Sequence, residues 1–230
     1  MTKAARLALD LINEKIQYEK NRPTSNGRNW KDQFDDVIDE FTIMGASKRG
    51  WTTWTIASVD KRVKAAIPMV LDCLNMKQIF SDWYQNMGAW SFALEPYYSE
   101  DLTYYFDDPI FDRMADVVDP YSYRDRLTMP KMVISSTGDE FFAPDDSYAY
   151  FDGLPEGTTY LRLLPNAEHG MIPPQGLSSP SIAHGIRSFY MSVQKKFKLP
   201  TLKWIKKVDK EGYASGKFTS LLERSRVRIS

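Results

Sequence analysis

Three side chains of this sequence are of the types that form a nucleophile, a base and an orienting acid: Ser47, His169 and Asp139. A serine hydroxyl becomes a nucleophile when an imidazole takes its proton, and a carboxylate holds that imidazole in the required tautomer. The chain has two histidines, of which His184 falls inside a helical pattern and His169 lies in a loop before a glycine. The sequence therefore points to His169 as the general base.

Ser47 lies in a turn of small residues, Gly45–Gly50, between a short apolar run and a helical pattern. A nucleophile on a sharp strand-to-helix turn needs small neighbours, and the glycine and alanine before the serine supply them. The N-terminus of the following helix and the Lys48 backbone N–H are expected to stabilise an oxyanion there. The turn departs from G-x-S-x-G, because Gly50 follows the serine by three residues and Arg49 takes the usual place. By itself, such a turn is more often a plain strand–helix connection.

Asp139 follows a buried type of strand and precedes an apolar pair, which is a suitable place for a carboxylate that orients an imidazole. Glu140 is the competing carboxylate, and helix capping is its alternative role. Each of the three candidates follows a predicted strand, and the carboxyl ends of parallel strands meet at one edge of a sheet. The chain order serine, aspartate, histidine is that of α/β-hydrolases.

Strands and helices alternate along the chain, which predicts a parallel α/β sheet flanked by helices. Strands are predicted at residues 41–44, 63–71, 131–136 and 159–164. Helices are predicted at residues 2–18, 51–59, 144–151 and 181–197, the first with Thr2 as N-cap, and a loop at 21–33. We expect a partial α/β-hydrolase core at 1–72 and 129–198, a cap insertion at 73–128 and a basic C-terminal tail at 199–230.

The segment 73–128 is acidic and aromatic, with ten acidic residues, four basic residues and thirteen aromatic ones. We interpret it as a helical cap that lines a pocket. The predicted substrate-binding residues are Trp83, Tyr84, Trp90 and Asn75. For each aromatic side chain the alternative is packing in the interior of the cap, and for Asn75 it is a turn.

Composition excludes several classes of function. Equal numbers of basic and acidic residues and a pI near 6.7 argue against nucleic-acid binding. No apolar run approaches the roughly 20 residues needed to cross a bilayer, and Asp10 and Glu14 interrupt any signal-peptide core. One cysteine and two histidines argue against zinc or iron chemistry, so we expect neither a metal nor a cofactor.

Four blocks of the sequence, GASKRGWTTW, VDKRVKAAIPMVLDCLN, STGDEFFAPDDS and LPNAEHG, resemble the PhoPQ-activated pathogenicity-related protein family. Eukaryotic members of that family are called autocrine proliferation repressor A-like proteins. The resemblance covers roughly residues 1–205. It implies an α/β-hydrolase branch in which Ser47, Asp139 and His169 are nucleophile, acid and base, and it implies export from the cell.

The resemblance also predicts that this chain holds the later half of the fold. In an α/β-hydrolase the strand before the nucleophile is normally the fifth of about eight, and the first strand predicted here already has that place. The earlier strands, the second oxyanion donor and a signal sequence would then be missing. The strand at 41–44 would be an exposed edge through which the chain could self-associate, and residues 199–204 would start a β-rich extension.

Two functional hypotheses follow from these patterns. The first is a serine hydrolase that acts on an ester or amide of a small molecule or peptide. The alternative is a non-catalytic, secreted signalling protein that keeps the fold and binds a receptor, or a fragment without independent function. An intact triad favours the first hypothesis, and an incomplete oxyanion hole favours the second.

Overall fold

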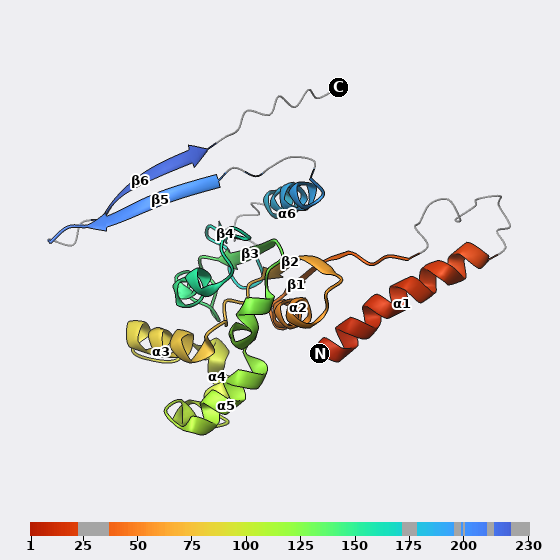
Figure 1. Cartoon of the computed structure of the whole chain (residues 1–230). Helices are drawn as coiled ribbons and strands as arrows, with labels where there is room; N and C mark the ends of the chain where they lie inside the picture. The colour runs from red at the N-terminus through yellow and green to blue at the C-terminus, as the bar shows by residue number, and fades with distance from the viewer. Residues whose placement is uncertain (23–36, 172–178, 196–198, 200, 211–213, 222–230) are drawn as a thin grey trace. The chain divides into compact units, whose positions relative to one another are not determined.

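The computed structural model describes residues 1–22, 37–171, 179–195, 199, 201–210 and 214–221 (Figure 1). Most of the loop predicted at 21–33 lies outside them. The chain divides into two compact units, Met1–Ser179 and Pro180–Ser230. The second unit contains nearly all of helix α6 (Ser179–Val193) and an antiparallel hairpin formed by strands β5 (Thr201–Val208) and β6 (Ala214–Leu221). Helix α6 overlaps the helix predicted at 181–197, and the hairpin lies in the segment predicted as a basic tail that starts a β-rich extension.

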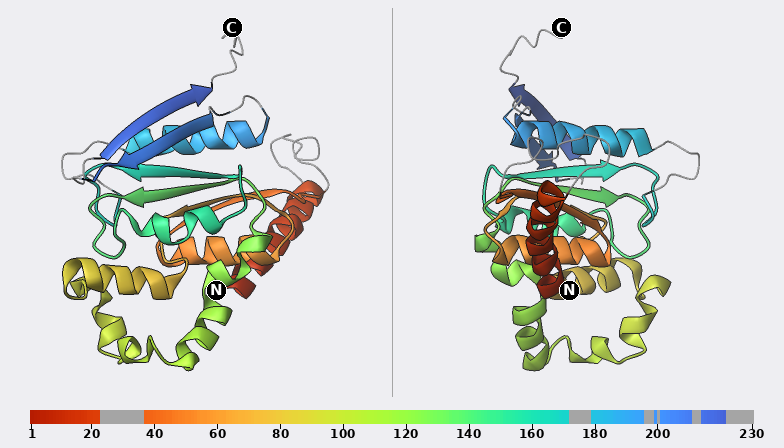
Figure 2. Two further views of the ribbon diagram at one scale, coloured as in Figure 1. Left: turned by 60° about the vertical axis from the view of Figure 1, so that its left-hand side comes forward. Right: turned by 90° about the vertical axis from the view of Figure 1, so that its right-hand side faces the viewer.

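The first unit is built on a four-stranded parallel sheet, as the sequence predicts. Its strands stand side by side in chain order: β1 (Phe41–Ala46), β2 (Val63–Met69), β3 (Lys131–Ser136) and β4 (Thr159–Leu164). Right-handed crossovers between successive neighbours place their connections on the same face of a sheet. Figure 2 shows helix α2 (Lys48–Val59) and the turns between β3 and β4 on one such face.

Burial distinguishes the central strands from the outer ones. Every residue of β3 is buried, as is every residue of β2 except Lys64, whereas β1 and β4 are partly exposed. Apolar runs that continue without alternation are typical of strands covered on both faces. Among the described strands, β1 is therefore an edge of the sheet, and the side chain of Met44 is 57% exposed.

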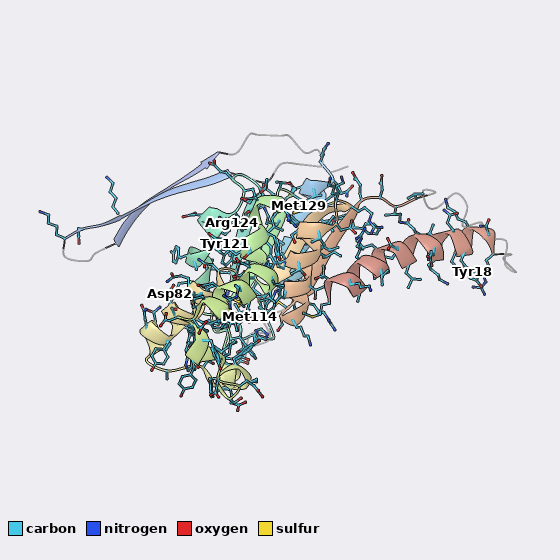
Figure 3. The ribbon with its side chains drawn as sticks, turned by 60° about the horizontal axis from the view of Figure 1, so that its bottom comes forward. Tyr18, Asp82, Met114, Tyr121, Arg124 and Met129 are labelled. Atoms are coloured by element: carbon cyan, nitrogen blue, oxygen red, sulfur yellow. The ribbon has the colours of Figure 1, made fainter. Side chains whose placement is uncertain are left out.

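The segment between β2 and β3 folds into short helices, as predicted for the cap. They are α3 (Met76–Met87), η1 (Phe92–Leu94), α4 (Glu95–Tyr98), η2 (Leu102–Tyr105), α5 (Pro109–Val118) and η3 (Pro120–Arg126). Aromatic rings hold them together: Phe106 stacks on Phe80 with centroids 5.7 Å apart and meets Phe111 edge-on at 4.8 Å. In Figure 3, Met114 marks α5, and Tyr121 and Arg124 mark η3, where the guanidinium lies 4.6 Å from the tyrosine ring centre.

The structure corrects one predicted N-cap, the start of one predicted helix and the existence of another. Helix α1 (Thr2–Asn21) has Met1 as N-cap, since the Thr2 hydroxyl donates to Thr55 Oγ1 at 2.8 Å. Helix α2 begins at Lys48 rather than at residue 51. The helix predicted at 144–151 is instead two 3₁₀ turns, η4 (Asp146–Ala149) and η5 (Phe151–Gly153). There the Asp146 carboxylate accepts the Ala143 N–H, and such side-chain bonds compete with helix formation.

Two glycines let β1, α2 and β2 approach each other at backbone distance. A Cβ atom on Gly45 would lie 2.5 Å from the carbonyl oxygen of Arg49, and one on Gly50 would lie 3.0 Å from the carbonyl oxygen of Met69. Gly50 thus provides the close packing that a glycine two residues after the serine provides in the usual motif. The Arg49 side chain is exposed, so its place in the motif costs no packing.

We expect Gly45→Ala to destabilise the protein by roughly 1–3 kcal/mol or more, because backbone atoms of α2 would have to move away from the new methyl group. Urea unfolding followed by circular dichroism measures this change. Gly170→Ala is the matched control, since a Cβ atom there meets nothing within 4 Å, and its effect should stay within about 1 kcal/mol. Equal stability of the two variants would contradict the close approach of β1 and α2.

Candidate active site

The structure brings Ser47, His169 and Asp139 together. Nε2 of His169 lies 2.8 Å from Ser47 Oγ, and its Nδ1 lies 3.0 Å from each carboxylate oxygen of Asp139. The three residues follow β1, β4 and β3, so the carboxyl ends of these parallel strands gather them at one edge of the sheet. His184 is an exposed residue of α6. The arrangement is a continuous hydrogen-bonded chain from a hydroxyl to a carboxylate.

Ser47 has a backbone conformation that residues other than glycine rarely adopt, with φ 51° and ψ −127°. Its N–H donates to the Met69 carbonyl at 2.9 Å, which ties the turn to the end of β2. Although Ser47 is the N-cap of α2, its side chain makes no cap hydrogen bond and instead meets the imidazole. Strain of this kind costs about 1–3 kcal/mol and is concentrated at functional sites.

Lys48 is the first residue of α2, so its backbone N–H is one of those at a helix start that have no partner inside the helix. The positive end of the helix dipole lies at the same place. This is the position that the sequence assigns to an oxyanion donor, and the geometry of the turn is compatible with that role.

The Asp139 carboxylate is buried and fixed. Its side chain is 1% exposed, and Oδ1 accepts the backbone N–H groups of Phe141 at 2.8 Å and Phe142 at 3.2 Å. The Phe141 ring centre lies 4.4 Å from that of the His169 imidazole. The apolar pair after the aspartate therefore both positions the carboxylate and covers the imidazole.

Glu140 does not compete with Asp139 for the imidazole. Its Oε2 accepts the backbone N–H of His169 at 3.0 Å, and its carbonyl oxygen accepts the hydroxyl of Ser91 from the cap. The Gly138 N–H donates to the Ala167 carbonyl at 2.9 Å, which is a second link between the two loops. Nothing in the sequence indicated this role, because the partner lies in a different loop.

A cavity of about 670 Å³ adjoins Ser47. Its described lining comes from α1, α2, the end of β2, the cap and the Asp139 loop, and includes Lys48, Trp51, Leu71, Phe80, Met114 and Phe141. The indole N–H of Trp51 donates to the Val118 carbonyl at 2.8 Å, so α2 and the cap are joined at the cavity wall. Trp51 follows Ser47 by four residues, and this helical spacing is the signal that could have identified it.

The four predicted substrate-binding residues lie elsewhere, since none is among the described residues that line this cavity. Trp83 is buried on α3, and the rings of Tyr84 and Trp90 contact each other with centroids 5.1 Å apart. Asn75 has φ 62° before α3 and donates to the Ala149 carbonyl. We correct the assignment on this ground: packing within the cap and a turn occupy these side chains.

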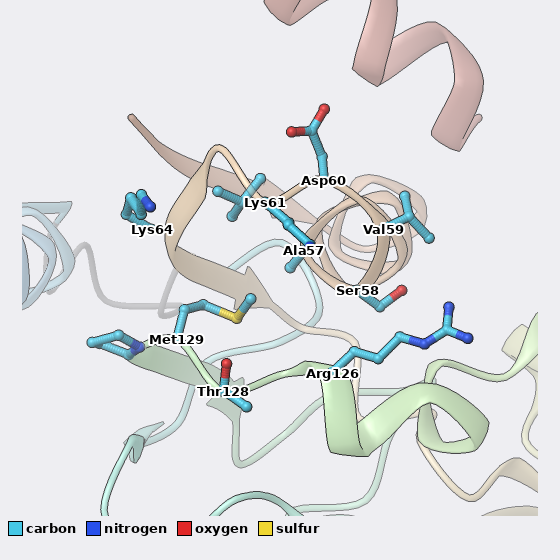
Figure 4. A pocket seen from close by; sticks show the side chains of 11 residues that line it. Ala57, Ser58, Val59, Asp60, Lys61, Lys64, Arg126, Thr128 and Met129 are labelled. Atoms are coloured by element: carbon cyan, nitrogen blue, oxygen red, sulfur yellow. The ribbon is translucent and has the colours of Figure 1, made fainter. Parts of the chain in front are cut away.

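A second cavity, of about 790 Å³, lies at the opposite end of α2 (Figure 4). Its lining includes Lys61, Lys64 and Arg126. None of the three candidate catalytic residues, Ser47, Asp139 and His169, lines it. The one carboxylate in the described lining, that of Asp60, is bound by Arg62 at 2.7 Å, which holds the pKa of that carboxyl below its usual range. We assign no function to this cavity.

Neither a metal site nor a membrane helix is found in the described part of the chain. No group of three or more histidine, cysteine, aspartate or glutamate side chains there could hold a metal ion. No helix among the described residues is long and apolar enough to span a bilayer.

Asp72 and Asp146 are two more of the carboxyl groups that are buried in the first unit. Asp72 is hydrogen-bonded by the Tyr150 hydroxyl, and burial, with the nearby charge of Asp139, raises its pKa to about 6. Burial raises the pKa of Asp146 to about 9, and the charge of Asp72 adds to that effect. Both groups are therefore easier to protonate in the folded protein than in the unfolded chain.

We expect Asp146→Asn to stabilise the protein at pH 8 and to stabilise it much less at pH 5. A carboxyl whose pKa is raised in the folded state binds its proton more tightly there, so its contribution to stability falls as pH rises above about 4 and until pH passes about 9. Stability falls by about 1.4 kcal/mol per pH unit in this range. Asparagine removes this dependence and keeps an acceptor for the Ala143 N–H. Urea unfolding at both pH values measures the difference. Asp145→Asn, at an exposed neighbour, is the control, and a pH-independent effect of Asp146→Asn would contradict the raised pKa.

Two comparisons of the sequence find proteins that are similar to this chain. The family model of the PhoPQ-activated pathogenicity-related protein matches residues 1–226. Autocrine proliferation repressor protein A from Dictyostelium discoideum is 44% identical over 137 residues, which are 58% of this chain and 27% of that protein. The chain thus spans about a quarter of the curated relative that it matches.

Solved structures resemble the chain in fold. Puromycin hydrolase, as an S511A mutant complexed with PGG, has a TM-score of 0.51 at 15% identity, over 70% of this chain and 23% of that one. MGS-M2, an α/β-hydrolase enzyme from a Medee basin deep-sea metagenome library, has a TM-score of 0.44 at 15% identity, over 83% and 72%. The parallel sheet with its cap and strand-to-helix turn is an α/β-hydrolase fold. Because the family model extends over nearly the whole sequence, the chain belongs to the PhoPQ-activated pathogenicity-related protein family.

Proposed function

We propose that this protein is a serine hydrolase that cleaves an ester or amide bond with Ser47 as nucleophile. The observation that carries the proposal is the hydrogen-bonded chain from Ser47 through His169 to Asp139. The left-handed backbone of Ser47 supports it, because that conformation turns the hydroxyl away from the helix it would otherwise cap. A packing role explains neither feature.

In the proposed reaction, Ser47 Oγ attacks the carbonyl carbon of the substrate while Nε2 of His169 takes the hydroxyl proton. The bond between the carbonyl carbon and the leaving group then breaks, and His169 gives its proton to the departing oxygen or nitrogen. Water attacks the resulting acyl-enzyme, His169 again takes a proton, and Ser47 is restored. Asp139 stays ionised throughout, fixing the Nδ1–H tautomer and stabilising the imidazolium that forms twice.

The negative charge that develops on the carbonyl oxygen needs donors that are already in place. In the proposal, the Lys48 N–H at the start of α2 supplies one, and the helix dipole adds to it. A second donor would come from another loop, for which the described residues offer no assignment. Lys48 is therefore proposed as the first half of the oxyanion hole.

A second candidate function rests on the name of the relative. Autocrine proliferation repressor protein A is named for an effect on proliferation rather than for a reaction. In this alternative, the protein is secreted, binds a receptor and does not turn over a substrate. Export and receptor binding are part of this proposal only.

Labelling with a fluorophosphonate probe tests the hydrolase proposal. We expect the probe to form an adduct at Ser47, located by mass spectrometry, and to form none on Ser47→Ala. Loss of the general base should slow labelling of His169→Gln by about 100-fold or more. His184→Gln, a change to an exposed histidine on α6, is the matched control and should label at the wild-type rate.

A folded wild-type protein that takes no label at Ser47 would overturn the proposal and favour the non-catalytic alternative. Circular dichroism spectra of each variant exclude loss of fold as the reason for lost labelling. Labelling at another serine would equally contradict the assignment of Ser47.

A further inference from the structure

The cavity beside Ser47 has the size and lining of a site for an apolar group. Its volume of about 670 Å³ lies within the range of roughly 300–1,000 Å³ that is usual for small-molecule sites. The wall is formed by aromatic and aliphatic side chains from four separate parts of the first unit, among them Trp51, Leu71, Phe80, Met114 and Phe142. Leu71, Phe80 and Phe142 are buried in the protein interior. The cavity therefore extends from Ser47 into the space between the parallel sheet with its helices and the cap.

Charge is nearly absent from this wall. The described lining residues include no carboxylate. They include one lysine, Lys48, which follows Ser47 and is exposed to solvent. The Cys73 thiol is buried, and burial raises its pKa, so it stays uncharged. The neighbouring carboxylates of Asp72 and Asp119 are already engaged, by the Tyr150 hydroxyl and by the Met76 N–H. A cationic group placed in the cavity would lose its hydration without gaining a carboxylate partner, and the described lysine of the lining is exposed to solvent.

Hydrogen bonds and ring contacts fix one part of the wall, and methionine side chains form another part. Trp51 is held by its bond to the Val118 carbonyl, and Phe141 by the Asp139 loop, with its ring 4.4 Å from that of His169. Met76 and Met114 form other parts of the lining, and unbranched methionine side chains adjust to irregular apolar shapes. Such a wall orients the scissile bond firmly while accepting chains of differing shape.

We infer that the substrate of this site is an ester whose acyl group is uncharged and apolar, of medium chain length, seated in the Ser47 cavity. This inference rests on the proposed hydrolase function. Each methylene group that enters the cavity should raise kcat/KM roughly fourfold, as expected for the transfer of one methylene from water. The increase should stop when the chain exceeds the cavity.

The test is a series of p-nitrophenyl esters: acetate, butanoate, octanoate and palmitate. We expect kcat/KM to rise by roughly 250-fold from butanoate to octanoate and to rise no further for palmitate. Met114→Gln, which places a polar amide in the wall, should lower kcat/KM for octanoate at least tenfold more than for acetate. Met87→Gln is the matched control, because Met87 is 62% exposed and does not line the cavity.

Failure of this inference can be distinguished from failure of the proposed function. Labelling of Ser47 by a small fluorophosphonate together with equal rates on acetate and octanoate would overturn the apolar acyl site and leave the hydrolase proposal standing. Calorimetry measures the binding of an octanoate ester to Ser47→Ala, and so tests the cavity without catalysis. Binding that is lost in Ser47→Ala combined with Met114→Gln supports the site, and no binding to Ser47→Ala overturns it.

Discussion

The close packing of β1, α2 and β2 around one turn is the constraint on which the rest of the structure depends. Gly45 leaves room for the carbonyl of Arg49, and Gly50 for the carbonyl of Met69. Between them the chain must reverse from strand to helix within a single residue, and that residue, Ser47, takes up the reversal with a positive φ. The serine side chain makes no cap hydrogen bond to α2, and its hydroxyl instead meets Nε2 of His169.

A second consequence of the parallel sheet is that the loops after β3 and β4 are neighbours. Their strands pair along their whole length, from Lys131 with Thr159 to Ser136 with Leu164. The loops therefore start side by side, and Glu140 and Gly138 bond them together at the His169 N–H and the Ala167 carbonyl. The imidazole position is thus set by hydrogen bonds that tie the backbone of the His169 loop to the Asp139 loop, which is the kind of preorganisation that a general base requires.

Sequence patterns predicted the parts that depend on local chemistry. The strands at 131–136 and 159–164 have the predicted bounds because apolar runs bounded by proline, glycine or polar residues leave few alternatives. The three candidate residues were identifiable because histidine is scarce in this chain and each candidate follows a strand. The helix expected at 144–151 failed because Asp146 bonds a backbone N–H in its own loop, a competition that composition does not reveal. The aromatic richness of the cap likewise could not say that Phe80 faces the cavity while Tyr84 and Trp90 face each other.

The buried carboxyl groups are chemically alike, but they differ in their hydrogen-bond donors and in their roles. Asp139 receives two backbone N–H groups and faces the imidazole, so several donors compensate its negative charge. Asp72 and Asp146 lie in the same interior with fewer such donors, and burial raises the pKa of each. Groups of one chemical type whose proton affinities are separated by environment are typical of acid–base sites. Of these three groups, Asp139 is the one bonded to His169, and this is the position from which a carboxylate can stabilise an imidazolium.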